Sequence, residues 1–251
     1  MLFRSYTIAI GWRALAYLLA AAWAVYWVDG AYLFLPDNGR LYLSVTGGAI
    51  TVLLIAWLTN LYNFMDGTDA LAAVQAICTG VMAGMLLNQS GQQGLAALCF
   101  VIAAASAGFL VWNRPPAKIF MGDAGSCLLG YSFAVLALMG HASGVSLYVW
   151  FILLAVFICG ATLTLLMRVI KKERFYSAHR AHAYQRIVQM GCSHAAVALG
   201  VLLINVMVLW PAAYMTYVHA EWSWMTASAI ILLMSLLWGG IQLGYYRGSG
   251  G

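Results

Sequence analysis

Long apolar runs separated by short polar stretches fill the chain from about residue 11 onward. Most runs are roughly 17–24 residues long, close to the length that an α-helix needs to cross a bilayer. The first run follows charged and polar residues without a small-residue cleavage site, so it reads as a retained helix and not as a signal peptide. The pattern predicts eight membrane-spanning helices, at 11–28, 41–61, 70–87, 94–112, 126–141, 144–167, 195–218 and 223–246.

The composition favours the same fold class. The chain is 64% hydrophobic and 8% charged, with a mean hydropathy of +0.88, whereas soluble domains carry about 25% charged residues. No soluble domain, coiled coil or low-complexity linker interrupts the apolar runs. We therefore predict an all-α polytopic membrane protein in which residues 1–251 form one integral membrane domain.

The basic residues indicate how the chain is oriented. With eight alternating spans, every Lys and Arg except Arg40 falls on one side of the membrane. The positive-inside rule makes that side cytoplasmic. The net charge of +5 is then explained by topology and by attraction to membrane lipids, and it needs no nucleic-acid partner. Because the polar loops lie on this side, we expect the active face to be cytoplasmic.

Three of the seven acidic residues, Asp66, Asp69 and Asp123, lie at the edges of apolar runs. A carboxylate at membrane depth costs roughly 2.5–3.5 kcal/mol, so it usually binds an ion, a proton or a substrate. Within NLYNFMDGTDALAA, the spacing predicts that Asn63, Asp66 and Asp69 share one face of a helix end, and that they stay clustered even if Gly67 breaks the helix. Such a set suits Mg²⁺. The alternative is that Asp66 caps the next helix and the asparagines bond between helices.

The segment PPAKIFMGDAGSCLLG follows a proline pair that ends one helix, and the next helix is predicted to begin near Ser126. Free N–H groups at that helix start could face an anion. Asp123 would hold a cation there, Lys118 would face a phosphate, and Phe120 could stack on a flat ring. The alternatives are that Asp123 is a plain N-cap and that Phe120 is a core or lipid-facing aromatic.

The segment RFYSAHRAHAYQR places His179, His182 and Arg186 in a basic loop beside the membrane. Such residues suit a diphosphate or a sugar. A basic loop that touches lipid headgroups is the alternative, and a zinc site at the two histidines lacks a third ligand nearby. The other histidines (His141, His194 and His219) lie at span ends, where we predict interface residues outside the site.

Together, the three segments resemble the polyprenyl-phosphate N-acetylhexosamine-1-phosphate transferases of glycosyltransferase family 4. NLYNFMDGTDALA is similar to the family's N-x-x-D-G-x-D-G-[IL]-A, and IFMGDAGSCLLG is similar to F-x-G-D-x-G-S-x-x-L-G. HRAHAYQR resembles the histidine-rich loop, and most closely the H-x-Y-Q-R of the O-antigen-initiating branch. The resemblance covers nearly the whole chain.

The resemblance implies transfer of an N-acetylhexosamine-1-phosphate from a UDP-sugar to undecaprenyl phosphate in the bacterial inner membrane, with release of UMP. It implies Mg²⁺ as the cofactor, with Mn²⁺ as an alternative, and UDP-N-acetylhexosamine, undecaprenyl phosphate and membrane lipids as partners. The product would start an O-antigen-like polysaccharide. The sequence leaves the oligomeric state open, with a homodimer among the options.

Positions carried over from the family give each residue an expected role. The resemblance makes Asp66, Asp69 and Asp123 catalytic, with Asp123 and Asp66 as metal ligands. The expected substrate-binding residues are Asn63 at the nucleotide or acceptor phosphate, Lys118 and Phe120 at phosphate and uracil, and His179, His182 and Arg186 beside the sugar and diphosphate.

Two departures from the family pattern carry further expectations. Ala70 replaces a glycine, which is a minor change. The family's adjacent Asp-Asp pair would precede the first run, and no such pair is present, so the chain looks N-terminally truncated relative to the family. We expect residues 1–251 alone to be inactive or severely impaired. The alternatives are an ion-coupled membrane transporter and a degenerate, non-catalytic membrane protein.

Overall fold

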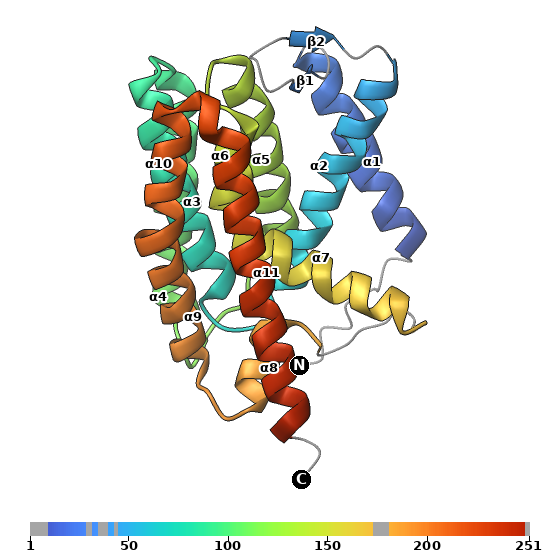
Figure 1. Ribbon diagram of the computed structural model, residues 1–251, viewed down its shortest axis with the longest axis vertical. Coiled ribbons are helices and arrows are strands. Elements are labelled where there is room, and N and C mark those ends of the chain that lie inside the picture. The colour runs from blue at the N-terminus through green and yellow to red at the C-terminus, as the bar shows by residue number, and fades with distance from the viewer. Residues whose placement is uncertain (1–9, 29–31, 35–39, 43–44, 173–180, 249–251) are drawn as a thin grey trace.

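The computed structural model describes residues 10–28, 32–34, 40–42, 45–172 and 181–248, which form a bundle of long helices (Figure 1). In chain order the elements are α1 (Ile10–Trp27), β1 (Tyr32–Phe34), β2 (Arg40–Tyr42), α2 (Val45–Met65), α3 (Leu71–Gln89), α4 (Gln93–Asn113), α5 (Gly122–Ala142), α6 (Leu147–Leu153), α7 (Ala155–Ile170), α8 (Ala183–Gln189), α9 (His194–Ile204), the π-helical turn η1 (Asn205–Leu209), α10 (Trp210–Val218), the 3₁₀ turn η2 (Ala220–Trp222) and α11 (Ser223–Gly248).

The predicted fold class is confirmed. Six described helices are long and apolar enough to cross a membrane, or seven if the bent pair α6 and α7 is one span. The helix α1, which packs along α2, is not among these helices. Each of the eight predicted spans is nevertheless helical over most of its length. The antiparallel pair β1 and β2 joins α1 to α2, a short hairpin that the apolar pattern did not predict.

Two helix boundaries differ from the prediction and change the site. α2 begins at Val45, after the hairpin, and ends at Met65. Asp66 and Asp69 therefore lie in the turn that follows, so the prediction that Asn63 and both acids share one helix face is wrong. α5 begins at Gly122, four residues before the predicted start. Asp123 therefore lies in the first helical turn.

The sixth predicted span is broken. α6 and α7 meet at an angle of 75°, and α7 runs obliquely across the bundle in Figure 1. The break frees the carbonyl of Leu153, which accepts hydrogen bonds from Gln75 Nε2 at 2.8 Å and from Thr79 Oγ1 at 3.4 Å. A free carbonyl in a bundle interior is costly, so α3 stabilises the bend.

Gln75 also joins α3 to the seventh predicted span, which runs continuously through α9, η1 and α10. Asn205 begins the π-helical turn, and its Nδ2 donates to Gln75 Oε1 at 3.1 Å. Both side chains are fully buried. Two interior amides thus satisfy each other and fix α9 and α10 against the bend between α6 and α7.

The bundle core lies between α2, α5 and α7. The Tyr62 ring packs 4.8 Å from Phe157 and 6.0 Å from Phe133, centroid to centroid, and all three side chains are fully buried. By contrast, Leu53 on α2 and Leu232 and Leu236 on α11 are about three-fifths exposed. This arrangement suits helices that pack inward on aromatics and present aliphatic chains to lipid.

One end of the bundle, here called the aspartate end, is formed where α2, α4 and α11 end and where α3, α5 and α9 begin. It is the lower end in Figure 1, where the short helix α8 also lies. Asp66, Asp69 and Asp123 all lie at this end, and so does Arg114.

Candidate active site

The crossing of α2 and α5 joins the first two sequence motifs. Asn63, in the last turn of α2, donates through Nδ2 to Asp123 Oδ1 at 3.0 Å and contacts Ser126 Oγ at 2.9 Å. Ser126 Oγ in turn donates to the Gly122 carbonyl. Gly122 has a φ of +67°, which a glycine adopts without strain. The amide of α2 therefore fixes the carboxylate in the first turn of α5.

Arg13 completes this cluster, and the sequence analysis did not place it there. Its guanidinium lies 3.1 Å from Asp123 Oδ2 and 3.3 Å from Asn63 Oδ1. From the sequence, Arg13 served only as an indicator of membrane orientation. A cation inside an apolar run is as costly as an acid, and that cost was the signal that could have revealed it.

Asp66 lies directly after α2 and is close enough to Asp123 for the two charges to interact. Burial, and then the Asp123 carboxylate, raise the pKa of Asp66 to about 7. The residue that precedes α3 is Ala70, and no side chain caps that helix. The alternative that Asp66 serves as a helix cap is therefore not supported. The site instead contains two carboxylates whose charges repel.

Asp69 faces different partners. Its Oδ2 accepts the Ala117 N–H at 3.1 Å and lies 3.3 Å from His194 Nδ1. Within the described ranges, no three His, Cys, Asp or Glu side chains converge to hold a metal ion. The three acids therefore do not form one cradle. His194, which the sequence analysis left outside the site, is the partner of one of its acids.

Asn113, the last residue of α4, joins the α4–α5 loop to the turn before α3. Asn113 accepts the Ala70 N–H at 2.8 Å through Oδ1 and donates to the Ile119 carbonyl at 2.9 Å. Beyond it, Lys118 is exposed, with Nζ 5.6 Å from the centroid of the Trp112 ring. Phe120 is 77% exposed, which excludes the core alternative for this ring. Both side chains are accessible to a ligand.

The third motif lies partly outside the described residues, and His179 falls there. His182 is buried, and its ring stacks 5.8 Å from Tyr184 and 6.2 Å from Phe64. The Tyr184 hydroxyl donates to the Phe64 carbonyl at 3.0 Å. A Cβ at Gly67 would clash with that hydroxyl. The loop therefore packs directly on the turn that carries Asp66.

Arg186 is buried and turns toward α11. Its guanidinium carbon lies 4.6 Å from the centroid of Tyr245 and 4.5 Å from that of Tyr246, and NH2 donates to the Tyr246 hydroxyl at 2.9 Å. The Lys171 ammonium donates to the same hydroxyl. These contacts give Arg186 a structural role between α8 and α11. Its expected role beside a sugar stays a prediction.

Comparison with known proteins places the chain in a family. The family model described as "Glycosyl transferase family 4" matches residues 5–141, the part that holds α1 to α5 and the cluster of Arg13, Asn63, Asp66 and Asp123. The chain belongs to glycosyl transferase family 4. The predicted family of polyprenyl-phosphate hexosamine-1-phosphate transferases is thereby confirmed.

Relatives within glycosyl transferase family 4 align with only part of the chain. A probable undecaprenyl-phosphate N-acetylglucosaminyl 1-phosphate transferase of Bacillus subtilis is 36% identical over 170 residues, 66% of this chain and 47% of the relative. A phospho-N-acetylmuramoyl-pentapeptide-transferase of Geobacillus kaustophilus is 41% identical over 128 residues, 49% of this chain and 39% of the relative. The chain thus spans less than half the length of these curated relatives.

The donor set suits the magnesium that glycosyl transferase family 4 implies. Burial, and then repulsion by the Asp123 carboxylate, raise the pKa of Asp66. A divalent cation between the two carboxylates would relieve that repulsion. Mg²⁺ is typically held by one or two carboxylates, with waters and substrate phosphates in the other positions. Two acids without a third protein ligand fit that pattern.

Proposed function

We propose that this chain transfers N-acetylhexosamine-1-phosphate from a UDP-sugar to undecaprenyl phosphate, releases UMP and thereby starts a cell-surface polysaccharide of the O-antigen type. The observation that carries the proposal is the joining of Asn63, Asp66 and Asp123, with Arg13, at one end of a membrane bundle. The name of the Bacillus subtilis relative supports the undecaprenyl acceptor and the N-acetylhexosamine donor. The active face would be the cytoplasmic face of the bacterial inner membrane.

In this proposal, the residues act mainly by positioning and by balancing charge. Asp66 and Asp123 would hold Mg²⁺, which when bound neutralises charge on the donor diphosphate. Asn63 keeps the Asp123 carboxylate in place. Arg13 pairs with the same acid and would use its remaining donors to contact a phosphate, because a guanidinium presents several donors. Lys118 and Phe120, both accessible, would contact phosphate and uracil.

The reaction itself is a phosphoryl exchange. An oxygen of the undecaprenyl phosphate forms a bond to the β-phosphorus of the UDP-sugar. The bond from that phosphorus to the bridging oxygen breaks, and UMP leaves with the electron pair. Since negative charge builds on the leaving oxygen as its bond to phosphorus breaks, fixed cations such as Arg13 would stabilise the transition state. Asp69 would act indirectly in this proposal, by holding the α4–α5 loop at Ala117.

An ion-coupled transporter is less well supported. Transporter sites usually lie near the middle of the membrane, at broken helices. Here the acids lie at one end of the bundle, and the broken pair α6 and α7 is stabilised by the neutral amide of Gln75. The side chains that bond to the Leu153 carbonyl at that break, Gln75 and Thr79, are both neutral.

The test uses purified residues 1–251 with UDP-N-acetylglucosamine labelled in the sugar. We expect Mg²⁺-dependent donor binding that Asp123→Asn weakens at least tenfold. Because residues 1–251 alone are expected to be severely impaired, transfer of label to undecaprenyl phosphate should be slow, with an equal release of UMP. The matched control is Glu221→Gln, which changes an acid at the opposite end of the bundle. Donor binding that is unaffected by EDTA or by Asp123→Asn would contradict the donor site. Binding without lipid-linked label would contradict the transfer step.

A further inference from the structure

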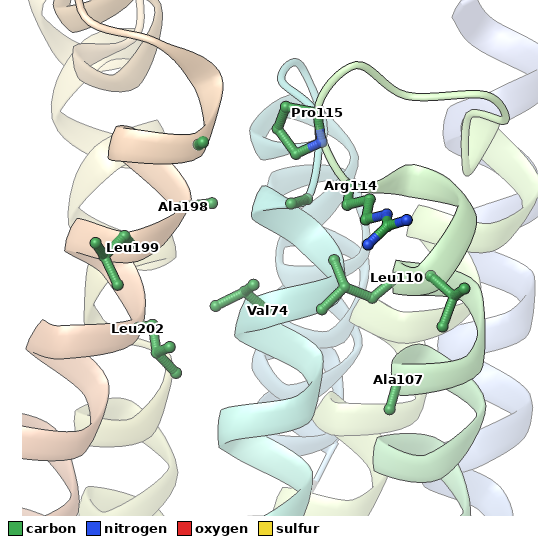
Figure 2. A pocket seen from close by; sticks show the side chains of 11 residues that line it. Val74, Ala107, Leu110, Arg114, Pro115, Ala198, Leu199 and Leu202 are labelled. Carbon is green, nitrogen blue, oxygen red and sulfur yellow. The ribbon is translucent and has the colours of Figure 1, made fainter.

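A lateral groove of about 400 Å³ lies between α3, α4 and α9 at the aspartate end (Figure 2). The groove is hollow because several of the side chains between the helices are alanines, which fill little of the space. Ala70, Val74 and Ala198 are buried and form its floor. Leu199 and Leu202 on α9 line one side and are 54% and 38% exposed. The groove is therefore an apolar channel that opens sideways from the bundle.

The location of the groove determines whether lipid or water fills it. Its walls belong to α3, α4 and the α9–α10 run, each long and apolar enough to span a membrane. Figure 2 shows Val74 and Leu110 facing Leu199 and Leu202 across the gap. An apolar groove in this position would be filled by hydrocarbon more favourably than by water. Its volume lies in the range of small-ligand sites, roughly 300–1,000 Å³.

The rim of the groove carries a positively charged side chain, that of Arg114. Arg114 follows the last residue of α4, lines the groove and is exposed. Its side chain makes no hydrogen bond or ion pair with any residue that the structure describes. The nearby acid Asp69 is already engaged by His194 and by the Ala117 N–H. The charge of Arg114 is thus available to an anion at the membrane boundary.

We propose that this groove binds one acyl chain of an anionic glycerophospholipid, with the headgroup phosphate at Arg114. An apolar channel between spanning helices, with a basic residue at its mouth, is the arrangement that binds anionic lipid headgroups in other membrane proteins. The guanidinium pairs with phosphate oxygens, and the alanine floor makes room for the chain. This site is separate from the Asn63–Asp123 cluster, and the proposal does not depend on the transfer chemistry.

Native mass spectrometry of purified residues 1–251 tests the proposal with two lipids, dioleoylphosphatidylglycerol and dioleoylphosphatidylcholine. Because one basic residue near a charged lipid contributes about 1 kcal/mol, the first binding event should be about fivefold tighter for phosphatidylglycerol. Arg114→Gln should remove that preference. Ala107→Trp, which fills the groove from α4, should weaken the binding of both lipids.

Two controls accompany these variants. Arg247→Gln removes a cation at the same end of the bundle but outside the groove, and Ala105→Trp adds the same bulk at an exposed position on the same helix. Both should bind lipid as the unmodified chain does. Equal affinity for the two lipids, or unchanged binding in Ala107→Trp, would overturn the proposal. Two other results would assign the groove to another occupant and so overturn the proposal. One is a dimer, seen as a doubled mass, that Ala107→Trp abolishes. The other is a first binding site that prefers undecaprenyl phosphate.

Discussion

His194 Nδ1 lies 3.3 Å from Asp69 Oδ2, which ties the first residue of α9 to the turn between α2 and α3. The same carboxylate oxygen accepts the Ala117 N–H from the α4–α5 loop. His194 Nδ1 is also 3.4 Å from the Asp69 main-chain nitrogen. A protonated imidazole donates to the carboxylate, and a neutral one can accept the N–H. In either state, one aspartate joins three segments that border the proposed transfer site.

We expect His194→Ala to loosen this junction without unfolding the protein. The histidine side chain is 37% exposed, so its loss should lower the free energy of unfolding by only about 0.5–1 kcal/mol. Amide hydrogen exchange should become faster in residues 66–70 and 113–119, which mass spectrometry can measure. His219→Ala removes a similar pair with Glu221 and should leave both segments unchanged. Unaltered exchange in His194→Ala would show that the pair does not hold the turn.

The stability of the ligand-free protein should depend on pH through Asp66. Its pKa is raised from 3.8 to about 7, so the folded protein binds a proton that the unfolded chain has released. The free energy of unfolding therefore falls as the pH rises between those two values, and the loss is complete above pH 7. In EDTA, Asp66→Asn should raise the unfolding temperature at pH 8 by more than at pH 5. An equal effect at both values would contradict the raised pKa.

Much of the fold could be predicted from the sequence, because apolar runs of bilayer length have few other stable forms. All eight runs are helical, and the first two motifs meet as expected at Asn63 and Asp123. The bend between α6 and α7 was not predicted. It is stabilised by a tertiary hydrogen bond from Gln75 to the Leu153 carbonyl, and no local signal near residue 153 indicates it.

The candidate site was predicted less well, for a geometric reason. Spacing along a helix relates residues only while the helix continues, and α2 ends at Met65. Asp69 consequently faces His194, and the partner of Asp123 is Arg13, 110 residues earlier in the chain. Such distant pairs carry no mark in a single sequence except the cost of each isolated charge in an apolar run.

Gly67 should be essential for the packing of the third motif on the Asp66 turn. Gly67→Ala places a Cβ against the Tyr184 hydroxyl, and overpacking of this kind costs about 1–3 kcal/mol. In Tyr184→Phe the clashing oxygen is absent. The double variant should therefore lose less stability than the sum of the two single variants. Denaturant unfolding measures this coupling. Gly108→Ala, with open space around its Cβ, should cost nothing, and strict additivity at Gly67 and Tyr184 would contradict the contact.

The buried amides Gln75 and Asn205 should be strongly coupled. Replacing either one by leucine leaves the other partly unpaired in the bundle interior, at a cost of about 1–3 kcal/mol. Gln75→Leu should be the more damaging change because it also removes the shorter of the two hydrogen bonds to the Leu153 carbonyl. Denaturant unfolding should show that the double variant loses less free energy of unfolding than the two single variants lose together. The control is Ser235→Ala, which changes a half-buried serine whose hydroxyl donates to the Ile231 carbonyl of its own helix. Additive losses would mean that the two amides act separately.

Arg13→Gln should change two affinities in opposite directions. Without donor, removing the cation beside Asp123 should strengthen Mg²⁺ binding several-fold, because a competing positive charge is lost. With Mg²⁺ present, UDP-N-acetylglucosamine should bind several-fold more weakly, because a phosphate partner is lost. Arg13→Lys should give affinities between those of the unmodified chain and Arg13→Gln, since it keeps the charge but not the guanidinium fork. Isothermal titration measures both affinities, with Arg247→Gln as the control. If both affinities fell together, Arg13 would be a structural contact of α1 and not a residue that binds phosphate.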